Sequence, residues 1–99
     1  VAGNTGVGLG VAMPHATVPG LTKTHLLVEV LASPIVYDAL DGTPVDVIFC
    51  TVGPAEERNT HLLLISSISR LILETAVLEQ IRDSKSSEDV MKIFERSLL

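Results

Sequence analysis

The sequence predicts a single α/β domain (mixed α and β), in which a mixed central β-sheet is flanked by α-helices. Three observations predict this class. The first half of the chain contains short apolar runs typical of strands, and the second half, after Pro54, spaces its apolar residues as helices do. The length of 99 residues suits one small domain, covering residues 1–99. Strands that come early and helices that come late favour a mixed sheet.

Two strands are expected before residue 34. The apolar run at residues 9–13 stops at Pro14, as a strand end does. Residues 16–22 are expected to form a loop with a turn at Pro19-Gly20. Residues 24–33 then alternate along a second strand. One face of this strand carries Leu26, Val28 and Val30, and the other carries His25, Leu27, Glu29 and Leu31.

A central strand is expected at residues 44–52, after a turn at Asp41-Gly42. The run is rich in β-branched residues and almost continuously apolar, which is typical of a strand covered on both faces. Cys50, the only cysteine, lies in this run and excludes a disulfide within the chain. Its apolar surroundings favour a buried, unreactive thiol.

Three helices are expected after Pro54. The first begins near Asn59, with Asn59 or Thr60 as its N-cap, the second covers roughly residues 75–83, and the third begins at Ser86 or Ser87. The first and third present apolar faces, made respectively of Leu64, Ile68, Leu71 and Ile72, and of Val90, Ile93, Phe94 and Leu98.

Composition restricts the partners and the compartment. A formal net charge of −5 argues against nucleic acid as the main partner, because a phosphate backbone attracts an excess of Lys and Arg. The same charge is compatible with a basic protein partner. No apolar run reaches the roughly 18 to 20 residues of a membrane-spanning helix, and no signal peptide is evident at the start. We therefore expect a cytoplasmic protein without direct membrane insertion.

The chain begins at Val1 without an initiator methionine, so an N-terminally truncated domain is expected. An open α/β sheet needs cover on both faces. If part of that cover is missing, Leu27 and Leu31, or the opposite face of the same strand, would be left exposed. A surface of this kind marks either the contact with an absent segment or self-association into a homo-oligomer.

Glycines at positions 3, 6, 8 and 10 suggest a phosphate-binding loop, but their spacing excludes the known nucleotide motifs. No Gly-x-Gly-x-x-Gly can be drawn, no Lys-Ser or Lys-Thr follows, and Pro14 prevents the helix that such motifs require. These glycines are instead expected to support unusual backbone angles or close packing at a tight strand entry.

His15 is the first candidate for chemistry. Pro14 fixes its own φ and removes a backbone donor, so the chain that enters His15 is stiff. An imidazole on a stiff strand end is well placed to act as a nucleophile or as an acid-base group. The alternative is a turn histidine with no chemical role.

His61 is the second candidate. It follows Asn59-Thr60 and is expected in the first turn of a helix, where free amides and the helix dipole favour an anion. The dipole also opposes protonation, which keeps the imidazole neutral. Together with His15 this suggests phosphate chemistry, with phosphate-binding groups from Thr5 and Gly6. The alternative is again a plain helix-end histidine.

Other sites are disfavoured. His25 alternates with exposed-type residues and is treated as a bystander. Three histidines without His-x-x-x-His or Cys-x-x-Cys spacing do not suggest a metal site, and no cofactor is implied. The serines at positions 66, 67 and 69 lie in a helical segment without a Gly-x-Ser-x-Gly motif, so a serine hydrolase is not expected.

Three segments together resemble one family. They are TGVGLGVAMPHA (5–16), DALDGTPVDVIF (38–49) and THLLLISSISRLI (60–72). Their order and spacing are similar to the enzyme IIA component, type 2, of the bacterial phosphoenolpyruvate-dependent phosphotransferase system, the fructose/mannitol and nitrogen-regulatory group. The resemblance runs over essentially the whole chain.

The resemblance implies a phosphotransferase component that forms a phosphohistidine intermediate. His15 matches the histidine that accepts the phosphoryl group from an HPr-type phosphocarrier protein. His61 matches the second active-site histidine, which assists transfer. The group then passes to a IIB domain for sugar uptake, or the protein acts on a regulatory target. The family also has an active-site arginine in an N-terminal portion, which no residue here matches.

Overall fold

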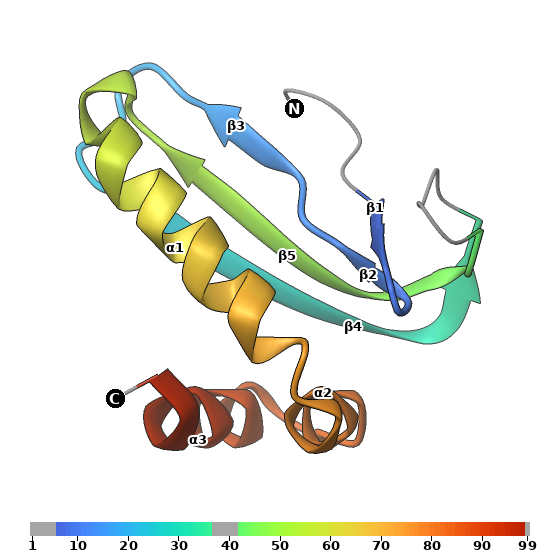
Figure 1. Ribbon diagram of the computed structural model, residues 1–99. Coiled ribbons are helices and arrows are strands. Elements are labelled where there is room, and N and C mark those ends of the chain that lie inside the picture. Colours follow the sequence, from blue (N-terminus) through green and yellow to red (C-terminus); the bar gives the residue numbers. More distant parts are fainter. Residues whose placement is uncertain (1–5, 37–41, 99) are drawn as a thin grey trace. The chain divides into compact units, whose positions relative to one another are not determined.

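The computed structural model describes residues 6–36 and 42–98 (Figure 1). The chain forms two compact units, Val1–Leu62 and Leu63–Leu99. The first contains the whole β-sheet and the start of the first α-helix. The second contains the remainder of that helix and two more helices. The mixed α/β class predicted from the sequence is confirmed.

Within residues 6–36 and 42–98, five strand segments precede the helices. They are β1 (Gly6–Gly8), β2 (Val11–Ala12), β3 (His15–Thr17), β4 (His25–Ile35) and β5 (Val45–Gly53). A 3₁₀ helix, η1 (Ala55–Glu57), leads into α1 (Arg58–Leu71), which is followed by α2 (Thr75–Arg82) and α3 (Ser87–Leu98).

β5 is the central strand, as the sequence predicts (Figure 1). β2 and β3 run parallel to β5 along one edge, and β4 runs antiparallel along the other. The short break at Met13-Pro14 separates β2 from β3, yet both keep register with β5, so that Val11 pairs with Val47 and His15 with Thr51. Parallel and antiparallel pairs in one sheet make it mixed.

The two faces of β5 differ in exposure. Val45, Val47, Phe49 and Thr51 are 0 to 1% exposed, whereas Asp46, Ile48, Cys50 and Val52 are only partly buried. Within the described residues the second set is covered only in part, and the expectation of a buried Cys50 is not met, because its side chain is only partly buried. Both faces of β5 carry apolar residues, so the sequence alone does not reveal that buried and partly exposed residues alternate along the strand. Leu27 of β4 lies on the more open face and is 55% exposed.

The glycine-rich segment forms a hairpin rather than one strand. β1 and β2 are antiparallel and are joined through Leu9 and Gly10, which both have positive φ (60° and 77°). Positive φ at both central residues is typical of a two-residue hairpin turn that follows the sheet twist. The prediction of a strand over residues 9–13 is thus wrong at its start, because glycine conformation overrides the apolar pattern.

The loop after β3 starts later than predicted, because residues 15–17 pair with β5. The predicted Pro19-Gly20 turn is confirmed. Leu21 N–H donates to the Val18 carbonyl at 3.4 Å, and Gly20 has φ 91°. Proline followed by a glycine of positive φ is the pattern of a type II turn. Asp41 lies outside the described residues, while its neighbour Gly42 has φ 72°.

The helices follow the predicted order with one shifted start. α1 is preceded by η1, so the helical segment begins at Ala55 and neither Asn59 nor Thr60 is its N-cap. α2 and α3 begin and end close to the predicted residues. Ser86 caps α3, because its Oγ accepts a hydrogen bond from Asp89 N–H at 3.2 Å.

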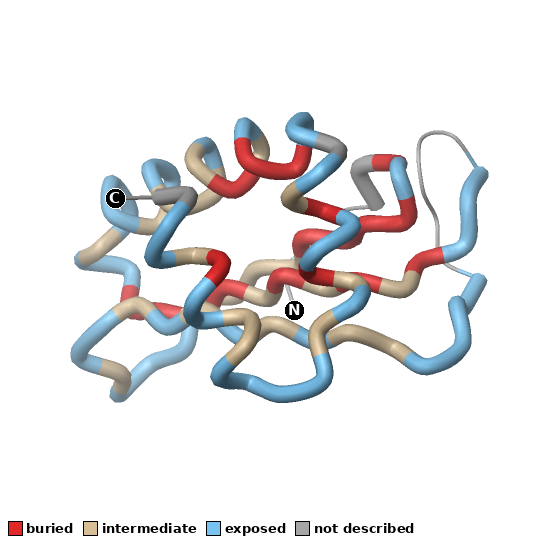
Figure 2. Tube along the Cα trace, turned by 90° about the horizontal axis from the view of Figure 1, so that it is seen from below, coloured by how far each residue is buried: buried red, intermediate tan, exposed pale blue. Residues whose placement is uncertain are grey.

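The second unit has its own buried residues at helical spacing, seen as red segments along the helices in Figure 2. They are Ile68, Leu71, Ile72, Leu78, Ile81 and Ile93. Among the described residues, no single helix is long and apolar enough to cross a membrane, and only α1 with its 3₁₀ turn and α2, taken together across a sharp bend, reach that length and composition.

Gly53 ends β5 at a point where a side chain would not fit. A Cβ there would lie 2.7 Å from Thr24 Oγ1 and 3.1 Å from Thr24 Cα. We therefore expect Gly53→Ala to lower the free energy of unfolding by roughly 1–3 kcal/mol through overpacking, measured by urea denaturation.

The matched control is the same substitution in a Thr24→Ala background. Removing Oγ1 removes the nearest clashing atom, so Gly53→Ala should cost less there than in the wild type. An equal cost in both backgrounds would show that this contact does not set the requirement for glycine.

Candidate functional site

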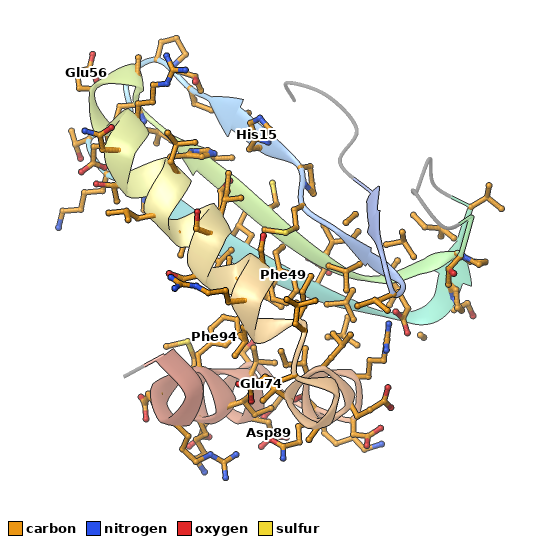
Figure 3. The ribbon with its side chains drawn as sticks, in the orientation of Figure 1. His15, Phe49, Glu56, Glu74, Asp89 and Phe94 are labelled. Carbon is orange, nitrogen blue, oxygen red and sulfur yellow. The ribbon has the colours of Figure 1, made fainter. Side chains whose placement is uncertain are left out.

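His15 opens β3 and is held by the sheet (Figure 3). The carbonyl of Pro14 accepts a hydrogen bond from Thr51 N–H at 3.0 Å, and His15 is in register with Thr51. Because paired residues on neighbouring strands project to the same face, the His15 side chain shares the face of Thr51. The sheet thus fixes the position of His15 along the strand and the face from which its imidazole projects.

His61 projects from α1 onto the same residue. Its Nε2 and the Thr51 Oγ1 are 2.9 Å apart and share a hydrogen bond. The rings of His15 and His61 lie edge to face, with centroids 5.5 Å apart and planes at 77°. The structure therefore brings together the two histidines that the sequence analysis selected, 46 positions apart in the chain, and adds Thr51 between them.

The segment that carries His61 is attached to the sheet near the end of β5. Thr24 Oγ1 donates to Glu57 Oε1 at 3.1 Å, and Glu57 N–H donates to the Pro54 carbonyl at 3.1 Å. The Gly53 carbonyl accepts from Val18 N–H at 2.9 Å, just beyond β3. These bonds restrain η1 relative to the strands, and with it the start of α1.

The electrostatics of His61 favour a neutral ring. Burial lowers its pKa below the usual 6.5, since the charged form loses water contacts, and the positive charge of a protonated His15 lowers it further. A neutral imidazole keeps one donor and one acceptor nitrogen.

His61 is the fourth residue of α1 and so lies in the first turn of that helix, as the sequence predicts. The sequence does not predict the 3₁₀ turn η1, which runs directly into α1, so the helical segment as a whole starts at Ala55. Glu56 and Glu57 occupy the first turn of this segment. Their carboxylates complement the helix dipole at its start.

One nitrogen of His15 is enclosed. Its Nδ1 is buried and has no hydrogen-bond partner among residues 6–36 and 42–98. An incoming reagent can reach a ring nitrogen only where that nitrogen is open to the surroundings. The burial of Nδ1 therefore disfavours a reaction of His15 at that nitrogen.

The remaining predicted residues have different outcomes. Thr5 lies outside the described residues. Gly6 pairs with Ala12 in the β1–β2 hairpin. His25 is exposed and in register with Val52, which places it on the sheet face opposite to Thr51. His25 therefore lies on the other side of the sheet from His15 and His61.

Thr51 is the site residue that sequence reasoning missed. It is 1% exposed and is the only polar member of the buried set on β5. The available signal was a hydroxyl residue at an inward position of an otherwise apolar strand, since such a group needs a hydrogen-bond partner. Within the described part of the chain, no group of three or more His, Cys, Asp or Glu side chains could hold a metal ion.

We predict that His61 titrates below pH 6.5 and that His15→Asn raises its pKa, because the substitution removes the neighbouring positive charge. The measurement is an NMR titration of the imidazole resonances. The unfolded chain binds this proton more tightly than the folded one, so the contribution of His61 lowers stability as the pH falls from 6.5 through the folded-state pKa.

His25→Gln is the matched control for this titration. It removes a histidine from the opposite face and should leave the pKa of His61 unchanged. A His61 pKa at or above 6.5 in the wild type would contradict the prediction, as would a pKa that does not respond to His15→Asn.

Comparison with known proteins places this chain in a family. Residues 1–97 match the family model described as phosphoenolpyruvate-dependent sugar phosphotransferase system, EIIA 2. A nitrogen regulatory protein homolog from Haemophilus influenzae is 38% identical over 96 residues, which cover 94% of this chain and 58% of that protein. A fructose-specific EIIA component from Haloferax volcanii is 30% identical, covering 90% of this chain and 58% of that protein.

The fold agrees with the sequence comparison. The crystal structure of the nitrogen regulatory protein IIA-Ntr from Neisseria meningitidis superimposes with a TM-score of 0.85 at 31% identity, covering 92% of this chain and 62% of that one. The chain thus spans a little more than half the length of each of these three relatives. With a family model matched over nearly all of its residues, the chain belongs to the EIIA type 2 family of the phosphoenolpyruvate-dependent sugar phosphotransferase system.

Proposed function

We propose that this protein is a phosphocarrier that accepts a phosphoryl group on His15 from an HPr-type phosphocarrier protein and passes it on. The observation that carries the proposal is the pair of imidazoles with centroids 5.5 Å apart, one of them fixed by the β3–β5 register. Membership of a phosphotransferase family gives this pair its chemical context. No cofactor or nucleic acid takes part, and the relay operates in the cytoplasm.

In the proposed step, the lone pair on Nε2 of His15 attacks phosphorus in line with the nitrogen that leaves. The new N–P bond forms as the N–P bond of the donor phosphohistidine breaks, and its electron pair returns to the donor nitrogen. The transition state spreads negative charge over the phosphoryl oxygens, so positioned donors assist it. The N–H of a neutral His61 is such a donor, and its ring lies next to His15.

The names of the relatives suggest two roles for the phosphorylated protein. A IIB domain is the acceptor if the protein serves sugar uptake, the role suggested by the fructose-specific EIIA relative. A regulatory target, bound differently in the two phosphorylation states, is the partner if the protein is a switch. The nitrogen regulatory names of relatives at 38% and 34% identity favour this second role.

We expect incubation with phosphoenolpyruvate, enzyme I and HPr to add one acid-labile phosphoryl group, detected by intact mass before and after acid. His15→Ala should abolish the label. His61→Ala should still accept phosphate but pass it on about 10²-fold more slowly, the usual order of loss for one transition-state donor.

His25→Gln serves as the matched histidine control and should be labelled at the wild-type rate, because His25 lies on the opposite face of the sheet. An unlabelled wild-type protein beside a labelled control EIIA would refute the proposed function. Acid-stable phosphate would refute it too, and equal loss of acceptance in both histidine variants would refute the division of roles.

The attachment atom gives a separate prediction. Since Nδ1 of His15 is buried, the phosphoryl group should be found on Nε2. Phosphorus-coupled ¹⁵N NMR of the labelled protein distinguishes the two isomers. Phosphate on Nδ1 would mean that the ring turns over before it reacts.

A further inference from the structure

Thr51 contacts both halves of the site. Its backbone N–H donates to the carbonyl of Pro14 at 3.0 Å, directly before His15, and its Oγ1 lies 2.9 Å from Nε2 of His61. The residue is 1% exposed, so water does not compete for the hydroxyl. One buried residue thus sets the position of the strand that carries His15 and holds the ring of His61.

The direction of the Thr51–His61 hydrogen bond follows from the surroundings of the hydroxyl. In the part of the chain that the structure describes, His61 is the only side-chain partner of Thr51 Oγ1. If the hydroxyl accepted from His61 Nε2–H, its own proton would be buried without an acceptor, and a buried unpaired donor is costly. If it donates to Nε2, its proton is paired. The second arrangement is therefore favoured.

Donation by the hydroxyl has a consequence for the ring. An Nε2 that accepts a hydrogen bond carries the lone pair, so the proton of the neutral imidazole is on Nδ1. A neutral histidine side chain in water prefers the opposite tautomer, with the proton on Nε2. The contact with Thr51 is thus able to change which nitrogen of His61 is the donor.

We propose that Thr51 is a positioning residue: its buried hydroxyl donates to Nε2 of His61, which holds this ring as the Nδ1–H tautomer and leaves Nδ1–H as its one donor for phosphoryl oxygens on His15. The assignment of the Nδ1–H tautomer depends only on the contact between Thr51 and His61. Its use in transfer rests on the proposed function, and there the gain comes from a donor that is oriented before the reaction.

The test uses two substitutions of opposite chemistry. Thr51→Val keeps the shape and removes the hydroxyl, whereas Thr51→Ser keeps the hydroxyl and removes a methyl group. Long-range ¹H–¹⁵N correlation NMR of histidine-labelled protein, at a pH well above 6.5, reports the tautomer of His61 directly. We expect the Nδ1–H form in the wild type and in Thr51→Ser, and a shift toward Nε2–H in Thr51→Val.

Phosphoryl transfer from phospho-HPr is then measured on the same samples. Thr51→Val should slow transfer by about tenfold or more, while Thr51→Ser should stay within about threefold of the wild type. Far-UV circular dichroism and thermal melting establish that each variant is folded. If Thr51→Val does not fold, the tautomer of the wild type and the rate of Thr51→Ser still decide the question.

Each outcome has a definite meaning. An Nε2–H tautomer in the wild type overturns the inference without any variant. Transfer at the wild-type rate by Thr51→Val overturns the positioning role, whether or not its tautomer changes. A wild-type protein that shows the Nδ1–H form but never accepts phosphate refutes the proposed function and leaves the tautomer assignment standing.

Discussion

The register of β3 against β5 is the constraint on which the rest of the site depends. It places His15 level with Thr51, and Thr51 in turn reaches His61. Successive side chains of a strand alternate between faces, so a slip of one residue would turn His15 away from His61 altogether. The hydrogen bond from Thr51 N–H to the Pro14 carbonyl opposes that slip at the residue next to His15.

Pro14 and Gly53 lie where this strand pairing is interrupted and where β5 ends. Pro14 has no N–H to offer a neighbouring strand, yet its carbonyl still joins β5, so the edge continues across the break between β2 and β3. Gly53 lets β5 end against Thr24, whose hydroxyl holds Glu57 before α1 begins. The same few residues therefore align a strand on one side of the site and the start of a helix on the other.

The sequence predicts the central strand, and it singles out His15 and His61, whose rings lie close together in the fold, because a Pro-His step, a helix start and a β-rich apolar run are local signals. Sequence reasoning was wrong or incomplete where a turn, a 3₁₀ segment or a tertiary contact overrides the apolar pattern. Leu9 was assigned to a strand, although it lies in a turn set by the flanking glycines. The 3₁₀ turn η1 before α1 was missed, and in it the amide of Glu57 is satisfied by the Pro54 carbonyl rather than by an Asn or Thr side chain. Thr51 was missed because its importance comes only from pairing with His15 and His61.

The acidic residues at the start of the helical segment affect how strongly a phosphoryl group would be bound in the proposed transfer. A site built on free helix amides would bind a phosphoryl dianion strongly in the ground state, and uniform binding of this kind does not accelerate the chemical step. Here Glu56 and Glu57 occupy that helix end, and the groups beside His15 are a neutral imidazole and a buried hydroxyl. In the proposed transfer, the imidazole would stabilise charge that develops on the phosphoryl oxygens without holding the product tightly, and the hydroxyl of Thr51 would act only through that imidazole. A phosphocarrier of the proposed kind has to release its phosphoryl group as readily as it accepts it, and weak ground-state binding by His61 would suit both steps.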